Sequence, residues 1–307
     1  VFDICYNFSM STLPLRQLLR EEFPALLAEI PQPPKALWAV GNLPPPDLVL
    51  IAVVGSRQYT TYGKQAVEQL IGGLKGYPVG IVSGLALGID ALAHETALTA
   101  GLYTLAVPGS GLLERVIYPA TNRRLAQRIV EAGGGLMSEL SPDTRAALWT
   151  FPQRNRIMAG MCTATLLIEA GEKSGTLITA RMAVDYNREL LVVPGSIFSP
   201  TSRGCHQFLK LGATPVTSVA DILDVLNIEQ TTTETKTMDE SNLSPEAILV
   251  LTHLPEPTDR DTLITRLCLP TAAANIVLMQ VELEGHIVAE GGIYTPRTFL
   301  PATPPLQ

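Results

Sequence analysis

The chain has 307 residues, of which 46% are hydrophobic and 17% are charged, so it is long enough to bury one large core and to carry a smaller unit as well. No run approaches the roughly 20 apolar residues that a membrane span needs, and the first residues lack a basic segment leading into an apolar one, so no membrane partner is expected and a cytoplasmic location is predicted. The formal net charge of −7 argues against a surface that is basic throughout, because binding to phosphates needs clustered Lys and Arg.

The first part of the chain, residues 1–46, is expected to form an extended lead-in. It combines a predicted short helix over residues 13–27 with proline-rich runs at residues 30–34 and 44–46. Because proline lacks a backbone N–H and fixes φ, such runs are typical of extended chain and turns.

Residues 47–225 predict a Rossmann-like α/β domain, with a mostly parallel sheet and helices on both of its faces. Short, wholly apolar runs alternate there with glycine-bearing turns and with amphipathic stretches of helix length, a pattern typical of strands buried on both sides. Ligands of such sheets meet the carboxyl ends of the strands, so we expect the binding face on the loops that follow them. The expected strands cover residues 48–54, 79–82, 103–107, 136–137, 164–168 and 189–193.

A polar segment of low complexity makes residues 226–243 a predicted linker. Residues 244–300 are expected to form a second unit. Its first helix is predicted to begin at Ser244 and Pro245, because serine is a common helix cap and proline suits the first helical position. Three helices followed by a two-stranded wing indicate a small winged-helix domain. The remaining patterns are helical over residues 260–267 and 271–284 and hairpin-like over residues 285–294.

The first glycine-bearing loop, Gly55-Ser56-Arg57, follows an apolar strand and precedes a helix expected around residues 64–74. Free backbone N–H groups and the positive end of the helix dipole favour an anion at such a place. Gly55 lets the backbone approach closely, Ser56 offers a hydroxyl, and Arg57 can hold a phosphate with its planar fork. The three spaced glycines of a dinucleotide turn are missing and no P-loop pattern occurs, so no nucleotide cofactor is expected.

The most informative stretch is Phe151-Pro152-Gln153-Arg154-Asn155-Arg156. It combines a ring for base stacking, two guanidinium groups for phosphates and an amide for hydrogen bonds, just before a small-residue helix expected over residues 157–162. In an arbitrary sequence Phe151 would more often belong to the core and the arginines to a solvated face, and this plainer interpretation remains open here.

Two other loops offer polar groups at the same edge. Lys173-Ser174-Gly175-Thr176 opens a predicted helix over residues 177–186, so its donors could meet an anion. Ser83-Gly84 begins a small-residue loop that is suited to packing a helix on the sheet. His94 in the following helix is interpreted as structural, because no nucleophile partner is evident beside it.

The charges are segregated along the chain. Residues 115–210 hold 12 basic and 7 acidic residues, a net of +5, whereas residues 211–307 hold 4 basic and 13 acidic residues, a net of −9. A polyanion is therefore expected to meet the middle of the chain and to be repelled by its end. The four cysteines are scattered, without a close pair or a histidine at ligand spacing, so neither a metal site nor a disulfide is expected.

Six strings in order along the chain resemble the successive signatures of the DNA-processing protein A family (DprA, also called Smf), and the resemblance runs from about residue 48 to 220. They are Val54–Arg57, Ile81–Ala91, Tyr118-Pro119, Phe151–Gly160, Ser174–Arg181 and Val193–Pro200. The resemblance implies a non-catalytic protein that binds single-stranded DNA, forms a homodimer through its Rossmann-like domain and helps to load the recombinase RecA during natural transformation.

Carried over residue by residue, the resemblance assigns DNA binding to Gly55, Ser56 and Arg57 and to Phe151, Arg154, Asn155 and Arg156. The loop argument adds Ser83, Gly84, Lys173, Ser174, Gly175 and Thr176. Some members of the family carry a lysine after the Tyr-Pro pair, whereas here the nearest basic residue is Arg123. Many members also carry an amino-terminal helical domain, for which residues 1–46 are expected to be too short.

The acidic end is similar to the winged-helix domain found in part of this family. Its predicted recognition helix, residues 271–284, contains no Lys or Arg, although winged helices often read DNA with a basic helix. We therefore expect it to bind protein or to regulate rather than to read DNA.

Two enzyme classes remain as alternatives. A phosphoribohydrolase-like nucleotide hydrolase would need a catalytic acid after a glycine-rich turn, and Glu114 after Pro108-Gly109-Ser110-Gly111 stands one residue early, without the expected threonine. An NAD-dependent dehydrogenase lacks both its glycine fingerprint and an acidic ribose partner.

Overall fold

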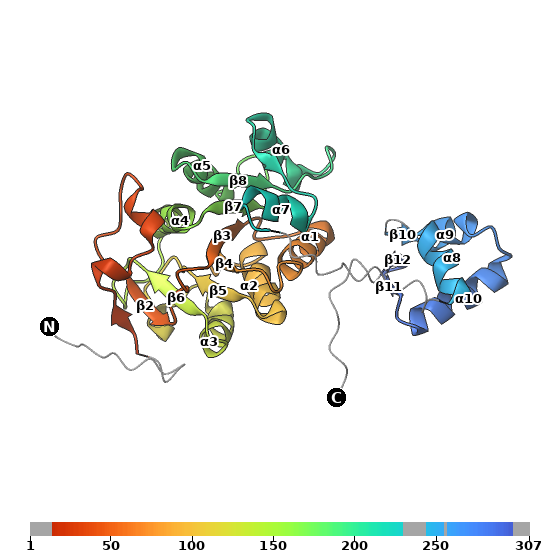
Figure 1. The fold of residues 1–307 in the computed structure, drawn as a ribbon, viewed down its shortest axis with the longest axis horizontal. Helices are drawn as coiled ribbons and strands as arrows, with labels where there is room; N and C mark the ends of the chain where they lie inside the picture. The colour runs from red at the N-terminus through yellow and green to blue at the C-terminus, as the bar shows by residue number, and fades with distance from the viewer. Residues whose placement is uncertain (1–13, 230–243, 255–256, 297–307) are drawn as a thin grey trace. The chain divides into compact units, whose positions relative to one another are not determined.

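The computed structural model describes residues 14–229, 244–254 and 257–296 of the chain. The chain divides into two compact units between Glu229 and Gln230 (Figure 1), and each unit has its own hydrophobic core. Residues 230–243, most of the predicted linker, lie outside the described residues, as do residues 1–13, 255–256 and 297–307.

Within the described part of the first unit, nine strands form one sheet in the order β1-β2-β6-β5-β4-β3-β7-β8-β9. All pairings from β3 to β9 are parallel, which confirms the expected mostly parallel sheet. Each of the six apolar runs predicted as strands forms one. The strands are β1 (Arg16–Gln17), β2 (Trp38–Gly41), β3 (Val49–Val54), β4 (Val79–Ser83), β5 (Tyr103–Ala106), β6 (Gly135–Ser138), β7 (Ala164–Leu167), β8 (Glu189–Val192) and β9 (Thr214–Pro215).

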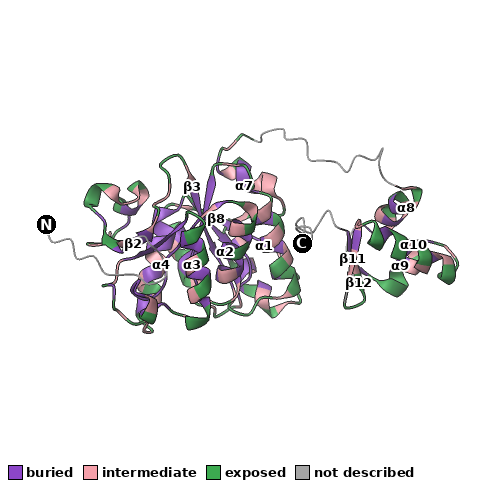
Figure 2. Cartoon of the chain, turned by 90° about the horizontal axis from the view of Figure 1, so that it is seen from below, coloured by how far each residue is buried: buried purple, intermediate pink, exposed green. Residues whose placement is uncertain are grey.

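Helices cover both faces of this sheet, and Figure 2 shows the buried strands between them. Ile51 and Val53 of β3 pack on the face of α1, α2 and α7. Ala52 and Val54 point the other way, into the core formed with α4, α5 and α6, as the two-residue period of a strand requires. The helices are α1 (Thr61–Gly72), α2 (Ile89–Ala100), α3 (Arg123–Glu131), α4 (Thr150–Met161), α5 (Thr176–Asp185), α6 (Arg203–Lys210) and α7 (Val219–Val225).

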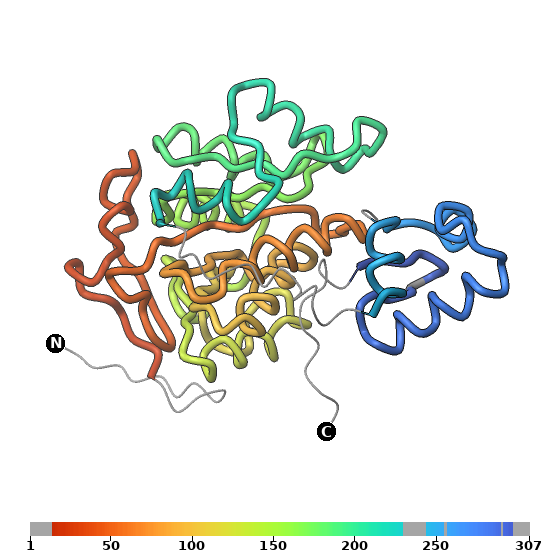
Figure 3. Tube along the Cα trace, turned by 45° about the vertical axis from the view of Figure 1, so that its right-hand side comes forward, coloured from red at the N-terminus to blue at the C-terminus, as the bar shows by residue number. Residues whose placement is uncertain are grey.

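The amino-terminal segment differs from the expected lead-in. The predicted helix over residues 13–27 is wrong: β1 and the short 3-10 helices η1 (Arg20–Glu22) and η2 (Ala25–Ala28) stand there instead. Strand β2 pairs antiparallel with both β1 and β6, so the segment lies along one edge of the first unit (Figure 3). Proline limits helix length here, and the buried Leu15 and Leu27 tie the segment to the core.

The second unit has the three helices and the wing that were predicted. Ser244 caps α8, since its side chain accepts a hydrogen bond from Ala247 N at 3.1 Å. The wing strands β11 and β12 pair antiparallel, and β10 adds a third strand. The elements are α8 (Pro245–His253), β10 (Thr258–Asp259), α9 (Arg260–Arg266), α10 (Thr271–Leu283), β11 (Ile287–Glu290) and β12 (Ile293–Pro296).

No single helix among the described residues is long and apolar enough to cross a membrane. Within the part of the chain that the structure describes, α9 and α10 reach that length and composition only as a pair, which is bent by 108°.

Candidate nucleic-acid interface

The loops at the carboxyl ends of the parallel strands form one edge of the first unit. From β3 the chain builds β4, β5 and β6 on one side and then returns to place β7 on the other side of β3. The order of the strands therefore reverses between β3 and β7, where open α/β sheets commonly bind their ligands. The loops after these two strands begin at Gly55 and Ile168.

An exposed arginine and an aromatic pair meet at this edge. The Arg57 guanidinium carbon lies 5.4 Å from the centre of the Phe151 ring, within the range of a cation–π contact. The rings of Phe151 and Tyr118 lie 5.9 Å apart at 55°, and Tyr118 is 49% exposed. Together with Leu87 and Pro119 these residues line a small hollow. The predicted combination of a basic group with a stacking surface is thus brought together from distant parts of the sequence.

Glycines make this arrangement compact. A Cβ at Gly109 would come within 2.6 Å of the Phe151 ring, so only glycine lets the ring lie on the backbone there. Gly88 has φ +83°, and its Cβ would come within 2.6 Å of the Arg57 Cα. Ile89 N donates to Ser56 O at 3.0 Å. The loop that carries Arg57 is therefore held directly against the loop after β4.

Arg154 lines the same hollow, but its guanidinium is engaged within the protein. Its side chain is 8% exposed and donates hydrogen bonds to the carbonyl oxygens of Gly84 and Val107. These carbonyls belong to the loops after β4 and β5. Arg154 thus joins two loops beneath the surface. The reason is helical phase: the expected loop 151–156 is in fact the first half of α4, and this face of the helix turns inward.

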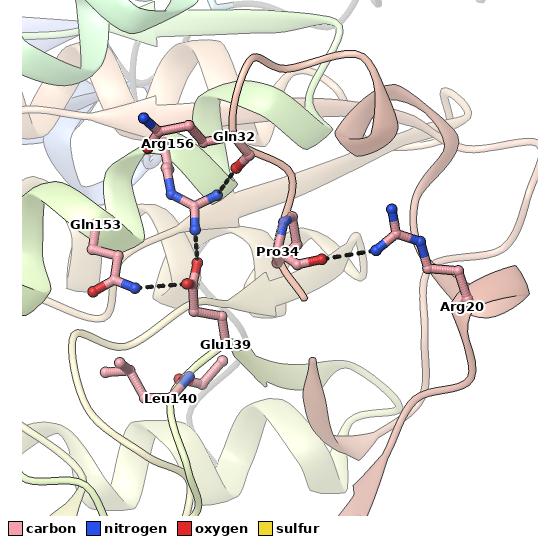
Figure 4. Close-up of polar contacts among 8 residues, drawn as sticks. Arg20, Gln32, Pro34, Glu139, Leu140, Gln153 and Arg156 are labelled. Carbon is pink, nitrogen blue, oxygen red and sulfur yellow. Dashed lines mark hydrogen bonds and ion pairs between the residues drawn. The ribbon is translucent and has the colours of Figure 1, made fainter. Parts of the chain in front are cut away.

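Arg156 is also engaged within the protein. It donates to Gln32 O and forms an ion pair with Glu139, which accepts a second hydrogen bond from Gln153 at 2.6 Å (Figure 4). Its side chain is 11% exposed. Arg156 therefore fastens the amino-terminal segment to the end of β6. Both terminal nitrogens of its guanidinium are thus engaged within the protein.

Three more of the proposed contact residues serve the protein's own structure. The buried Ser83 hydroxyl donates to Val53 O at 2.7 Å. Gly84 N donates to the Asp90 carboxylate at 3.1 Å, and a Cβ at Gly84 would overlap the Arg154 guanidinium. Asn155 is half-buried and accepts from Arg154 Nε at 3.0 Å.

The start of α1 already holds an anion, which the sequence did not indicate. The Glu169 carboxylate, 3% exposed, accepts hydrogen bonds from Thr60 N at 2.9 Å and from the Thr60 hydroxyl at 2.6 Å. Thr201 donates to the same carboxylate at 3.2 Å. Glu169 therefore fills the anion position expected at this helix start with a carboxylate of the protein itself.

In the remaining two loops, some polar groups bind within the protein and others are exposed. The Ser56 hydroxyl closes a local turn, donating to Gln58 O at 2.6 Å. Thr176 donates to Gly55 O at 2.9 Å, so the loop after β7 supports the Arg57 loop. Lys173 and Gly175 are exposed, and Ser174 is half-buried.

Burial governs the titratable groups nearest the interface. It lowers the pKa of His94 to about 3, and His94 Nδ1 lies 2.7 Å from the Thr104 hydroxyl. His94 is fully buried, so it cannot reach a ligand at the edge. Burial also raises the pKa of Asp90, while the Arg154 guanidinium opposes that rise. Among the described residues, no group of three or more His, Cys, Asp or Glu is placed to hold a metal ion.

Sequence reasoning missed two exposed side chains at this edge. Tyr118 was noted only as part of a motif, and Trp149, 60% exposed, stands one residue before α4. The position of an aromatic residue only two residues before Phe151 was the signal in the sequence that could have identified Trp149.

Both units of the chain match models of known protein families. A family model described as DNA recombination-mediator protein A matches residues 15–227, and one described as DprA winged helix domain matches residues 234–292. Both parts of the expected fold, the Rossmann-like domain and the winged helix, are thereby confirmed.

Relatives and solved structures agree with these matches. DNA processing protein DprA of Streptococcus pneumoniae is 41% identical over 210 residues, 68% of this chain and 73% of that protein. Protein Smf of Escherichia coli is 34% identical over 281 residues, 89% of this chain and 75% of that protein. The X-ray structure of the Streptococcus pneumoniae protein superposes with a TM-score of 0.64 at 40% identity, covering 70% of this chain and 75% of that one. DNA processing protein A of Helicobacter pylori, described for its single-stranded DNA binding mode, gives a TM-score of 0.61 at 29% identity, covering 69% and 95%.

Proposed function

The chain belongs to the DNA recombination-mediator protein A family, and from this premise we propose that it binds single-stranded DNA along the carboxyl edge of its Rossmann-like sheet. The observation that carries the proposal is the exposed Arg57 guanidinium held 5.4 Å from the Phe151 ring. Such a pair can meet a phosphate and a base in neighbouring positions of one strand.

The proposed contact surface contains only some of the loop residues that the sequence suggested. Arg57 and Phe151 form its centre, with Tyr118 and Trp149 as further stacking surfaces and Lys173 as a second cation. The backbone of Gly55, Ser56, Gly175 and Thr176 borders it. Arg154, Asn155, Arg156, Ser83 and Gly84 contribute by holding the loops in place, because each forms a hydrogen bond or an ion pair within the protein.

The central test compares the affinity for a single-stranded oligonucleotide with that for its duplex at the same salt concentration. We expect tighter binding of the single strand, because base stacking on Phe151 needs unpaired bases. Equal affinity for both would contradict the proposal.

The Arg57→Ala variant tests the residue at the centre. It should bind the single strand more weakly and reduce the slope of log affinity against log salt by about 0.7, the share of one phosphate contact on a single strand. Arg181→Ala is the matched control, because Arg181 is also exposed and lies 5.8 Å from the centre of a phenylalanine ring, that of Phe208, in a different hollow. An unchanged slope for Arg57→Ala would remove Arg57 from the site.

We propose further that the protein acts without catalysis in the cytoplasm, as a homodimer that helps to load RecA onto single-stranded DNA during natural transformation. In support, Glu169 fills the anion position where the strand order reverses, and His94 is buried away from the edge. Sedimentation of the full chain tests the dimer. The onset of RecA filament formation on an oligonucleotide already bound by the chain tests the loading step, and no acceleration would contradict it.

The alternative of a nucleotide hydrolase has its own test. Glu114 does not line the hollow beside Arg57, so incubation with nucleoside monophosphates is expected to release no free base. Release that disappears in Glu114→Gln would favour the enzyme.

A further inference from the structure

Helix α10 of the second unit is apolar on two opposite sides. One side carries Ala274, Leu278 and Val281, which are at most 1% exposed and form the core of this unit. The other side carries Ile276, Met279 and Leu283, which are 68%, 65% and 79% exposed. The core of this small unit accounts for the buried apolar side chains on the first side of α10. It does not account for the exposed apolar side chains on the second side.

The exposed side has the spacing of a helix-pairing surface. Ala272, which is also exposed, extends the three larger side chains to a row at positions 272, 276, 279 and 283. Steps of four, three and four residues keep one row facing a neighbouring helix. This row, called the α10 seam below, is flanked on one side by Asn275 and Glu282 and on the other by Gln280.

We propose that the α10 seam binds the α10 seam of a second copy of this chain, with the two helices antiparallel. In that arrangement Ala272 faces Leu283 of the second copy, and Ile276 faces Met279 of the second copy. A small residue then opposes a large one at each end, which fills the space evenly. A parallel pair would instead set Ala272 against Ala272 and leave a gap.

The charges beside the seam favour the same orientation. Arg260 donates to Asn275 at 2.9 Å, so its guanidinium lies along the flank that also holds Glu282. In an antiparallel pair each flank meets the same flank of the other helix, which brings Arg260 close to Glu282 of the second copy. Within the described residues neither side chain has an ion-pair partner, and both are exposed. A parallel pair would leave both charges unmatched.

The proposed contact is small. Four side chains on about 16 Å of helix make an interface at the weak end of the range. It would therefore act mainly between chains that are already held together, where the local concentration is high. The contact uses residues of the second unit only, and it rests on the proposed homodimer for the high local concentration.

Disulfide trapping tests the pairing in the full chain, with Cys5 and Cys268 replaced by serine so that the buried Cys162 and Cys205 are the remaining native thiols. Ala272→Cys chains mixed with Leu283→Cys chains should form covalent dimers on mild oxidation. Each variant alone should not, because an antiparallel pair keeps identical ends apart by more than the roughly 7 Å that a disulfide can bridge. Ile248→Cys mixed with Leu283→Cys is the matched control, since Ile248 is 45% exposed on α8, off the seam.

The expected result is cross-linking about tenfold faster for the seam pair than for the control pair. Arg260→Glu and Glu282→Arg should each slow it, and the two together in one chain should restore it, which a merely structural role of either residue would not produce. Equal rates for seam and control pairs would overturn the proposal and assign the seam to a different protein. Faster cross-linking of each variant alone would overturn the antiparallel arrangement.

Discussion

At the scale of single residues, three arginines near one edge of the sheet differ in what surrounds their guanidinium groups. Arg57 is exposed and lies over a ring face. Arg154 is buried among backbone carbonyls, and Arg156 is paired with Glu139. A guanidinium that is already satisfied in a buried place gains little from a phosphate, whereas an exposed one releases counterions when it binds. Binding and stability should therefore depend on different arginines.

Arg154→Ala is expected to lower the free energy of unfolding by about 3–5 kcal/mol, because it leaves two carbonyls and the neighbouring Asp90 without their buried cation. Arg57→Ala should change it by no more than about 0.5 kcal/mol, as for other exposed positions. Urea unfolding at pH 7 measures both. Similar unfolding curves for the two variants would contradict this division.

Phe151→Ala is expected to weaken binding to single-stranded DNA by about tenfold, because stacking of one base on an aromatic ring contributes roughly 1–3 kcal/mol. Phe151→Tyr keeps the ring and serves as the control, with an affinity near that of the original chain. The affinity for a fluorescent oligonucleotide measures the effect. If alanine and tyrosine variants bind equally well, Phe151 does not stack on a base.

The buried His94 predicts a pH dependence of stability. Its pKa is about 3 in the fold and near 6.5 in an unfolded chain. The unfolded chain therefore binds the extra proton first, and stability falls as pH drops from about 6.5 towards 3. His94 alone should remove about 2 kcal/mol between pH 7 and pH 5.

His94→Gln, measured by urea unfolding at both pH values, should lack this part of the loss, whatever its stability at pH 7. His253→Gln in the second unit is the control and should follow the original chain. An unchanged difference between pH 7 and pH 5 in His94→Gln would contradict the burial argument.

Only some of the residues that form the site could be predicted from the sequence. Arg57 and Phe151 stand out because a strand end and an aromatic-basic string are local patterns. The burial of Arg154 is not local: its partners, Gly84 O and Val107 O, lie 70 and 47 residues away. Carbonyl acceptors have no signature in a sequence, so an arginine that binds them looks the same as one that is free.

At the scale of elements, the interface depends on contact between the loops after β3 and β4. Gly88 lies at the point of closest approach, with φ +83° and with the backbone of Ser56 and Arg57 against it. A side chain there would push the Arg57 loop away from Phe151. The geometry of the site is thus set by a residue that has no functional group.

Gly88→Ala is expected to lower the free energy of unfolding by at least about 3 kcal/mol and to weaken DNA binding, because it combines an unfavourable φ with overpacking. Gly76→Ala is the matched control: φ is +88° there, and nothing lies within 4 Å of the added Cβ. The control should lose only roughly 1–2 kcal/mol, with unchanged binding. Equal losses in the two variants would show that loop contact at Gly88 does not matter.

Elements were predictable where their pattern was strong. Six of the seven parallel strands are apolar runs, and all six were predicted, whereas the two-residue β9 was not. Strand β2 was missed because Trp38–Gly41 follows a proline-rich run and pairs with β6. Met137, the partner of Ala39, lies 98 residues further along the chain, so this pairing becomes visible only in the fold. Helix α4 begins at Thr150, seven residues before the predicted start at 157, and Pro152 lies in its first turn, where proline is well tolerated.

At the scale of the whole molecule, the two units have separate cores and different net charges. Residues 230–307 carry 4 basic and 10 acidic residues, a net of −6. Residues 1–229 have a net charge of only −1. A polyanion should therefore be attracted by the local cations of the first unit and repelled by the second.

A chain ending at Glu229 is expected to bind single-stranded DNA at least as tightly as the full chain, because the proposed interface lies entirely within the first unit. Any gain in affinity of the shortened chain should be greatest at low salt. It should disappear as salt is added, because the range of electrostatic repulsion falls to about 10 Å at 0.1 M salt. Residues 230–307 alone should bind neither single strands nor duplexes, since α10 offers no Lys or Arg. Oligonucleotide titrations at several salt concentrations measure this, and a thermal melt of the shortened chain shows that its sheet remains folded. Weaker binding by the shortened chain would instead place part of the DNA site on the winged-helix unit.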